Sequence, residues 1–205
     1  MMFQNLWAVS STDYKGPKAG FSEAHIIKAI LEIGERNKLG RTRLATLLEL
    51  GQGEIRTLLK RLKENGLIEI VSNGCELTDL GKKNYREIIR AIPWRSVVDG
   101  SSLGIGDHCF AINVRGKASK VSKGLEQRDA AIRAGASGAV TVIYGAKKFR
   151  IPSEGDDCEA SGPSEPWISI RKSVPRTDDV IIVCGGETPL VAEYGGLTAA
   201  LTLLR

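Results

Sequence analysis

Residues 40–81, GRTRLATLLELGQGEIRTLLKRLKENGLIEIVSNGCELTDLG, decide the fold of the first half of this chain. Apolar residues recur with helical spacing twice in this stretch, first from about Thr42 to Gly51 and then up to Asn65. A tight Gly51-Gln52-Gly53 turn separates the two segments, and Gly51 is a natural left-handed cap for the first of them. The stretch therefore predicts two short helices joined by a turn.

The residues that follow predict a β-hairpin. They alternate between apolar and polar side chains, and Asn73-Gly74 is the strongest two-residue hairpin signal. With these two residues in the loop, Ser72 pairs with Cys75 and Ile70 pairs with Leu77. We therefore expect Ile70 and Leu77 to lie together on a buried face.

Two further helices complete the predicted unit. Ser22 is a suitable cap for a helix that ends near Asn37, and Thr78 is a suitable cap for a helix that ends before Pro93. The order is helix, helix, helix, hairpin, helix, which is the order of a winged helix-turn-helix. We predict this α+β domain over residues 21–95, after an N-terminal arm of residues 1–20.

Positive charge is concentrated in this domain. The net charge of the chain is +5, but residues 36–95 hold 13 Lys and Arg against 7 Asp and Glu, whereas residues 96–205 hold 13 of each. Phosphate binding requires such a local excess. We therefore expect double-stranded DNA as the partner, and a winged helix that docks a protein is the alternative.

The outward face of the second helix presents groups that DNA recognition uses. Arg56 and Gln52 lie near its start and are candidates for contacts with guanine and adenine edges. The other basic residues suit phosphate contacts, and the hairpin tip has no Arg or Lys. The predicted DNA-binding residues are Arg41, Arg43, Gln52, Arg56, Thr57, Lys60, Arg61, Lys63 and Asn73.

The pattern RTRLATLLELGQGEIRTLLKRLKENGLI, followed by the hairpin and LTDLG, resembles the superfamily of bacterial and archaeal winged-helix transcription regulators. This resemblance covers about residues 20–95 and implies DNA binding. The whole layout, with GLEQRDAAIRAGASGA in the second half, looks like an uncharacterised family of archaeal winged-helix proteins. Membership in that family would imply a regulator-like architecture and no known chemistry.

The second half of the chain predicts a Gly-rich α/β domain over residues 96–205, because apolar runs and helical segments alternate there. Residues 153–165 are acidic and rich in Gly and Ser, which predicts a loop. The predicted strands are 108–114, 139–144, 148–151, 167–171 and 180–184, and the predicted helices are 122–134 and 189–204.

The best candidate site in this domain follows the strand 180–184. A strand, a glycine turn and a helix start together expose backbone N–H groups at a positive dipole end, which suits a polar or anionic effector. The predicted ligand-binding residues are Gly185, Gly186, Glu187, Thr188 and Arg128. A plain tight turn is the alternative, because the Gly-x-Gly-x-x-Gly fingerprint is lacking and Glu187 would repel an anion.

Other functions find little support. The chain has no apolar run near the roughly 20 residues of a membrane span, and its start lacks the plan of a secretory signal, so we expect a cytoplasmic protein. The four cysteines form no CxxC pair, and only two histidines are present. We therefore predict no catalytic residue, no metal site and no cofactor.

The sequence as a whole predicts a DNA-binding transcription regulator. Its second domain would sense a small molecule or form a homodimer, with the apolar helix 189–204 as the first choice of dimer surface. Two alternatives stay open, namely an enzyme with an accessory winged helix and a protein-interaction adaptor.

Overall fold

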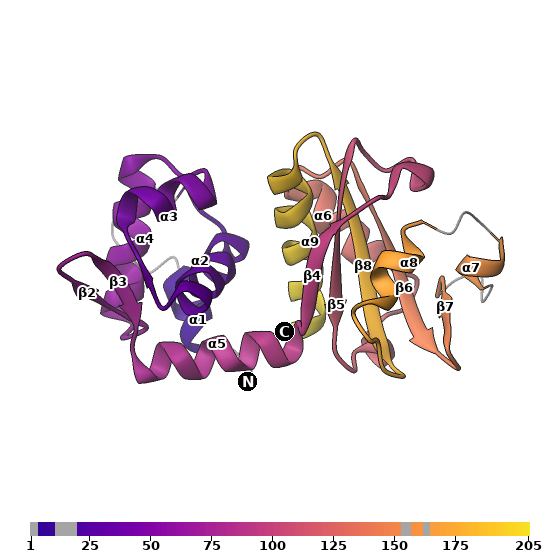
Figure 1. Ribbon diagram of the computed structural model, residues 1–205, viewed down its shortest axis with the longest axis horizontal. Coiled ribbons are helices and arrows are strands. Elements are labelled where there is room, and N and C mark those ends of the chain that lie inside the picture. Colours follow the sequence, from indigo (N-terminus) through magenta and orange to yellow (C-terminus); the bar gives the residue numbers. More distant parts are fainter. Residues whose placement is uncertain (1–3, 11–19, 153–156, 162–164) are drawn as a thin grey trace. The chain divides into compact units, whose positions relative to one another are not determined.

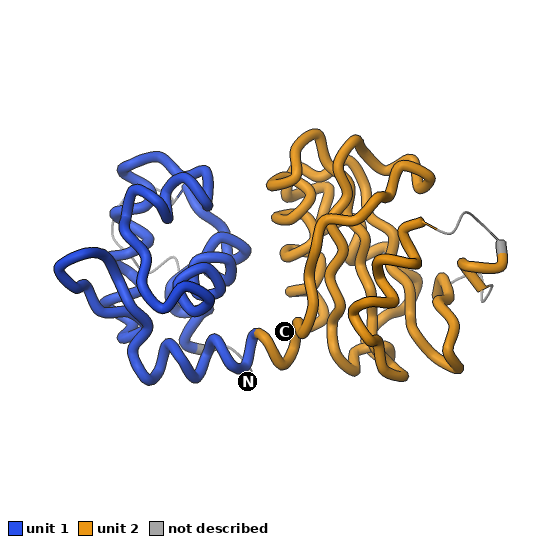
Figure 2. The backbone as a smooth tube through the Cα atoms, in the orientation of Figure 1, with its two compact units in different colours: residues 1–88 blue, residues 89–205 orange. Residues whose placement is uncertain are grey.

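The computed structural model describes residues 4–10, 20–152, 157–161 and 165–205 (Figure 1). The chain forms two compact units, residues 1–88 and 89–205 (Figure 2). The division falls within a helix, α5 (Asp79–Ala91), shortly before the predicted boundary at residues 95–96. Among the described helices, none has the length and apolarity needed to cross a bilayer.

The N-terminal unit contains helices and a three-stranded antiparallel sheet of order β1-β3-β2. The predicted order of helices and hairpin is confirmed, and two elements that were not predicted, α1 and β1, are added to it. The elements are α1 (Gln4–Ser10), α2 (Glu23–Arg36), β1 (Lys38–Leu39), α3 (Arg41–Leu48), α4 (Gln52–Glu64), β2 (Ile68–Val71), β3 (Gly74–Leu77) and α5.

The junction between α3 and α4 differs from the prediction. Helix α3 ends at Leu48, and Glu49 rather than Gly51 adopts the left-handed conformation that closes it, with φ of 49°. Leu50 is buried, so the helix must end before this residue to turn its side chain inward. Gly51 has an extended backbone ahead of α4, and its N–H donates to a carboxylate oxygen of Glu54 at 2.8 Å.

The register of the hairpin also differs from the prediction. Ile70 pairs with Cys75 and Ile68 pairs with Leu77, so the loop consists of Ser72-Asn73. Ile68 and Leu77 are buried, but Ile70 is 53% exposed, and the prediction that it is buried was wrong.

A contact with β1 explains the shift. Gly74 has φ of 149°, and a Cβ atom on it would lie 2.5 Å from the carbonyl oxygen of Leu39 in β1. Only glycine fits where the backbone of β1 approaches so closely. Gly74 therefore lies in β3 instead of in the loop, and the loop moves one residue toward the N-terminus.

The start of α2 holds a neutral histidine. The Ser22 N–H donates to Nδ1 of His25 at 3.1 Å, so this nitrogen carries no proton. The pKa of His25 is lowered to about 4, mainly because the ring is buried; Glu54 opposes this decrease and Lys28 adds to it.

Because the pKa of His25 is lower in the folded state than its ordinary value of 6.5, protonation favours the unfolded state. We expect the free energy of unfolding to fall as the pH decreases from 6.5 to about 4, and His25→Gln to remove this component. Urea denaturation at a series of pH values measures it. An unchanged pH slope in the variant would contradict the assignment.

The C-terminal unit contains a five-stranded sheet of order β4-β5-β8-β6-β7 in which every pair is antiparallel. The elements are β4 (Trp94–Val98), β5 (His108–Val114), α6 (Leu125–Arg133), β6 (Gly138–Gly145), β7 (Lys148–Arg150), α7 (Cys158–Ser161), α8 (Trp167–Arg171), β8 (Asp179–Gly186) and α9 (Pro189–Leu204), with short 3-10 turns at Ser101–Leu103 and Ala118–Lys120.

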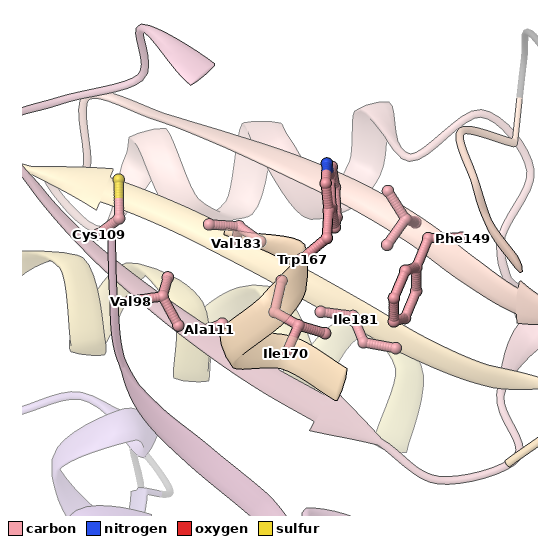
Figure 3. Packing of buried hydrophobic residues seen from close by; sticks show 9 residues of the cluster. Val98, Cys109, Ala111, Phe149, Trp167, Ile170, Ile181 and Val183 are labelled. Atoms are coloured by element: carbon pink, nitrogen blue, oxygen red, sulfur yellow. The ribbon is translucent and has the colours of Figure 1, made fainter. Parts of the chain in front are cut away.

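Helices cover both faces of this sheet. Figure 1 shows α6 and α9 on one side and α8 on the other. On the α8 side, Trp167 and Ile170 pack with Phe149 and with Ile181 and Val183 of the central strand (Figure 3). Every residue of β8 is buried as a result.

Three sequence-based expectations for this unit need correction. Residues 167–171 form the helix α8 instead of a strand, because Trp167 and Ile170 face the sheet at the i, i+3 spacing of a helix. Gly185 and Gly186 lie in β8 rather than in a turn after it. The predicted loop 153–165 contains α7, while its residues 153–156 and 162–164 lie outside the described residues.

Helix α9 begins and ends where it was predicted. The hydroxyl of Thr188 caps it by accepting the N–H of Val191 at 3.2 Å. After Pro189 no residue of α9 is exposed, because the helix packs against α6, β5 and β8. Its apolar composition is therefore explained by packing within its own unit, and its role as a dimer surface stays a prediction.

Candidate nucleic-acid interface

A groove of about 530 Å³ lies between α4, the β2-β3 hairpin and the start of α3. We call it the basic groove, because Arg41, Arg56, Lys60 and Lys63 line it and no acidic residue is found among the described residues of its lining. The apolar part of its lining, which we call the floor, includes Leu59, Ile70 and Cys75. Asn73, in the hairpin loop, is also part of its lining.

The face of α4 that lines the basic groove follows from helical periodicity. Arg56, Lys60 and Lys63 are exposed and share one face with Leu59, because they stand at i, i+4 and i+7 with Leu59 at i+3. The opposite face carries Ile55 and other fully buried residues. Burial of the apolar face thus fixes the direction of all three cations.

The start of α3 adds positive potential to the same groove. Gly40 precedes the helix with an extended backbone, and no side chain caps the first turn. The N–H groups of an uncapped first turn and the helix dipole both attract anions. Arg41, the first residue of α3, lines the groove beside this helix end.

The predicted DNA-binding residues are thus distributed unevenly. Five of them, Arg41, Arg56, Lys60, Lys63 and Asn73, line the basic groove. Gln52 and Arg43 are exposed outside its lining. The hydroxyl of Thr57 donates to the carbonyl of Gly53 at 2.9 Å and so is engaged within α4. Ile70, which the predicted hairpin register places on a buried face, contributes to the groove floor instead.

Arg61 does not face outward as predicted. Its side chain is only 8% exposed, its guanidinium donates to the carbonyl of Val9 at 3.2 Å, and it lies 5.5 Å from the ring centre of Phe21. Helix α1, whose Leu6 and Val9 are fully buried, packs against α2 and α4 and covers this side of α4. The spacing of apolar residues from Thr42 onward does not indicate that α1 covers this side of α4.

Removal of the Arg61 side chain is expected to destabilise the N-terminal unit without weakening DNA binding. Arg61→Ala leaves the Val9 carbonyl without this donor, and a buried unsatisfied polar group costs about 1–3 kcal/mol. Urea denaturation measures the loss, and DNA titration of the folded variant serves as the second readout. Unchanged stability together with reduced DNA affinity would return Arg61 to the interface.

The second predicted site is closely packed around its glycines. A Cβ on Gly185 would lie 2.1 Å from the carbonyl oxygen of Ile105, and one on Gly186 would lie 2.8 Å from the backbone nitrogen of Ala192. These glycines permit a loop and α9 to approach the sheet. Glu187 and Thr188 are exposed at the start of α9.

Arg128, the remaining residue of that predicted set, is exposed on α6 and pairs with Asp129 at 3.0 Å. It therefore belongs to the outer surface of α6. The effector site stays a prediction, with Glu187 and Thr188 as its accessible part.

The buried cysteines are unsuited to chemistry at neutral pH. Burial raises the pKa of Cys75 to about 11 and that of Cys184 to about 12, and it also raises the pKa of Cys109. All three are free thiols. The thiolate is the reactive form, so burial lowers the reactivity of these three thiols.

These features define a two-unit α+β protein whose first unit carries a basic groove. Residues 27–83 match the family described as PH0730-like, N-terminal domain, and residues 105–203 match the domain of unknown function DUF4443. The solved structure of the hypothetical protein PH0730 from Pyrococcus horikoshii OT3 is similar, with a TM-score of 0.69 and 25% identity over 86% of this chain and 91% of that chain. Comparison with curated proteins gives no match.

Both halves of the chain are therefore consistent with an uncharacterised archaeal family. The sequence-based resemblance to such a family is confirmed at that level. The two-unit layout of the fold agrees with the similar archaeal structure.

Proposed function

We propose that the N-terminal unit is a winged helix-turn-helix that binds double-stranded DNA through the basic groove, and that the protein regulates transcription. The observation that carries this proposal is the set of four cationic side chains from α3 and α4 that line one groove, in which none of the described lining residues is acidic. Cations arranged in this way neutralise phosphates, and the release of counterions drives association.

Helix α4 is the proposed recognition helix. Arg56, in its first half, can contact guanine O6 and N7 together, while Lys60 and Lys63 reach phosphates on either side. Lys60 also pairs with Glu64 at 3.8 Å. Exposed pairs of this kind contribute little, so Lys60 exchanges Glu64 for a phosphate at small cost.

The apolar floor of the groove favours a second candidate function. The half-exposed Ile70 offers an apolar surface that a DNA backbone does not need, although apolar side chains also contact thymine methyl groups. An acidic amphipathic protein segment would match both the apolar floor and the four cationic side chains of the groove. Protein docking is therefore the alternative that the experiment must separate from DNA binding.

Two alanine variants of the full-length chain test the DNA proposal. Arg56→Ala is expected to cost about 1–3 kcal/mol and to relax preference at one base position, whereas Lys63→Ala weakens all duplexes similarly. Selection from a randomised duplex library, followed by fluorescence anisotropy, measures both effects.

Lys123→Ala in the C-terminal unit is the matched control, because it removes one exposed cation outside the groove. The proposal fails if Arg56→Ala and Lys63→Ala bind duplexes as the control does. Protein docking would then be the remaining candidate for the groove.

For the C-terminal unit we propose a dimerisation role. A single recognition helix covers only a half-site, and regulators of this kind normally read two half-sites as a two-fold dimer. A small polar effector near Glu187 and Thr188 would act in addition. Thr188→Val tests that effector prediction better than a change of Gly186, whose added Cβ would collide with α9 whether or not a ligand binds.

A further inference from the structure

We infer that the outer face of α6 is the contact between two copies of this chain, with the two α6 helices packed in parallel. The first observation is a pair of large apolar side chains that the fold leaves exposed on this helix. Leu125 is 49% exposed and Ile132 is 47% exposed. They stand seven residues apart, which is about two turns, and therefore lie on one face of α6.

The core of the C-terminal unit does not require these two side chains. The inner face of α6 packs through Gln127, Ala130 and Ala131, which are buried. Gln127 also donates from Nε2 to the hydroxyl of Thr202 in α9 at 2.8 Å. The small inner residues allow α6 to lie close to α9, and Leu125 and Ile132 face away from this contact.

The charges on this outer face are arranged to suit a second copy. An α-helix advances about 100° per residue, so Arg128 and Asp129 lie about 50° to either side of the line that joins Leu125 to Ile132. Both stand near the middle of that line, because they differ in height by only about 1.5 Å. Each α6 thus presents a line of apolar side chains along its outer face. Arg128 lies on one side of this line and Asp129 on the other, at nearly the same height along the helix axis.

This pattern distinguishes between the two possible directions of packing. When two such helices pack in parallel around a two-fold axis, the left flank of one meets the right flank of the other. Arg128 of each copy then faces Asp129 of its partner, while Leu125 meets Leu125 and Ile132 meets Ile132. Antiparallel packing would place Arg128 against Arg128 and Asp129 against Asp129, and like charges across an interface are unfavourable.

The Arg128 and Asp129 side chains of one chain contact each other at 3.0 Å. This pair is exposed on both sides, so its contribution to stability is small and both side chains can exchange partners. The dimer contact involves no residue of the basic groove. It can therefore be tested without DNA, and its failure is independent of the proposed DNA binding.

The test is a charge exchange in the full-length chain, measured by sedimentation equilibrium from about 1 to 300 µM protein, a range that spans weak to moderate dimers. The unmodified chain is expected to dimerise. Arg128→Asp gives two acids at each contact and Asp129→Arg gives two bases, so each variant alone should dimerise at least about tenfold more weakly. An equimolar mixture of the two restores opposite charges at both contacts and should regain the affinity of the unmodified chain.

Lys172→Asp is the control, because it makes the same charge change on an exposed residue at the end of α8, away from α6. Leu125→Ser with Ile132→Ser is a second variant that should abolish the dimer, while circular dichroism confirms that it stays folded. A monomeric unmodified chain over the whole range, or single variants that dimerise like Lys172→Asp, would overturn the inference. So would a mixture that dimerises no better than its components.

Discussion

Replacement of both Arg56 and Lys60 by glutamate is expected to lower the affinity of the full-length chain for duplex DNA by about a thousandfold or more. Each lost contact accounts for about 1–3 kcal/mol, and each new carboxylate adds repulsion from phosphate. The basic groove would then hold two cations and two anions. Fluorescence anisotropy with a selected duplex measures the affinity.

The matched control for this variant is Lys83→Glu with Lys123→Glu, which makes the same change in net charge at exposed residues outside the groove. Arg56 and Lys60 are exposed, so the double variant should fold like the unmodified chain. Equal DNA affinities of the variant and the control would show that net charge, rather than the groove, attracts the DNA.

Replacement of Gly185 by valine is expected to destabilise the C-terminal unit by about 3 kcal/mol or more. The added Cβ would lie 2.1 Å from the Ile105 carbonyl oxygen, and a backbone atom cannot rotate away as a side chain does. The collision occurs in the central strand, where β5 and β6 hold Gly185 on both sides. Urea denaturation followed by tryptophan fluorescence measures the loss.

Gly145→Val provides the control for this prediction, because Gly145 also lies in a strand but a Cβ on it meets no atom within 4 Å. That variant should unfold at nearly the same urea concentration as the unmodified chain. A stable Gly185→Val protein would show that close packing does not explain this glycine, and a ligand-binding role for it would regain support.

The elements of the N-terminal unit could be predicted because their buried faces are periodic within each segment. Ile55, Leu58 and Leu62 define the inward face of α4, and this face leaves Arg56, Lys60 and Lys63 in the groove. Arg61 was predicted wrongly because its direction depends on a distant segment. Local spacing cannot show that α1 lies over it and supplies a carbonyl acceptor.

The hairpin shows a local preference overridden by a tertiary contact. Asn73-Gly74 favours a turn in isolation, but β1 pairs with β3 and places its backbone against Gly74. The resulting shift of register exposes Ile70 at the floor of the groove. No feature of residues 67–77 alone indicates that β1 lies there.

The position of Gly185 and Gly186 was predicted wrongly for a similar reason. A strand followed by Gly185-Gly186 and a helix start has the local appearance of a binding turn, whereas the structure shows glycines that admit Ile105 and α9 close to the sheet. Both explanations require glycine at these positions. The sequence near these glycines does not show that the backbone of Ile105 and of α9 lies against them.

The salt dependence of duplex binding by the unmodified full-length chain tests the central claim most directly. If the four cations of the basic groove neutralise phosphates, the logarithm of the association constant should fall with the logarithm of salt concentration at a slope of about −3 to −4 per N-terminal unit. Lys63→Ala should make this slope shallower by about 0.9. Absence of duplex binding at low salt, or an affinity that does not change with salt, would contradict the proposed function.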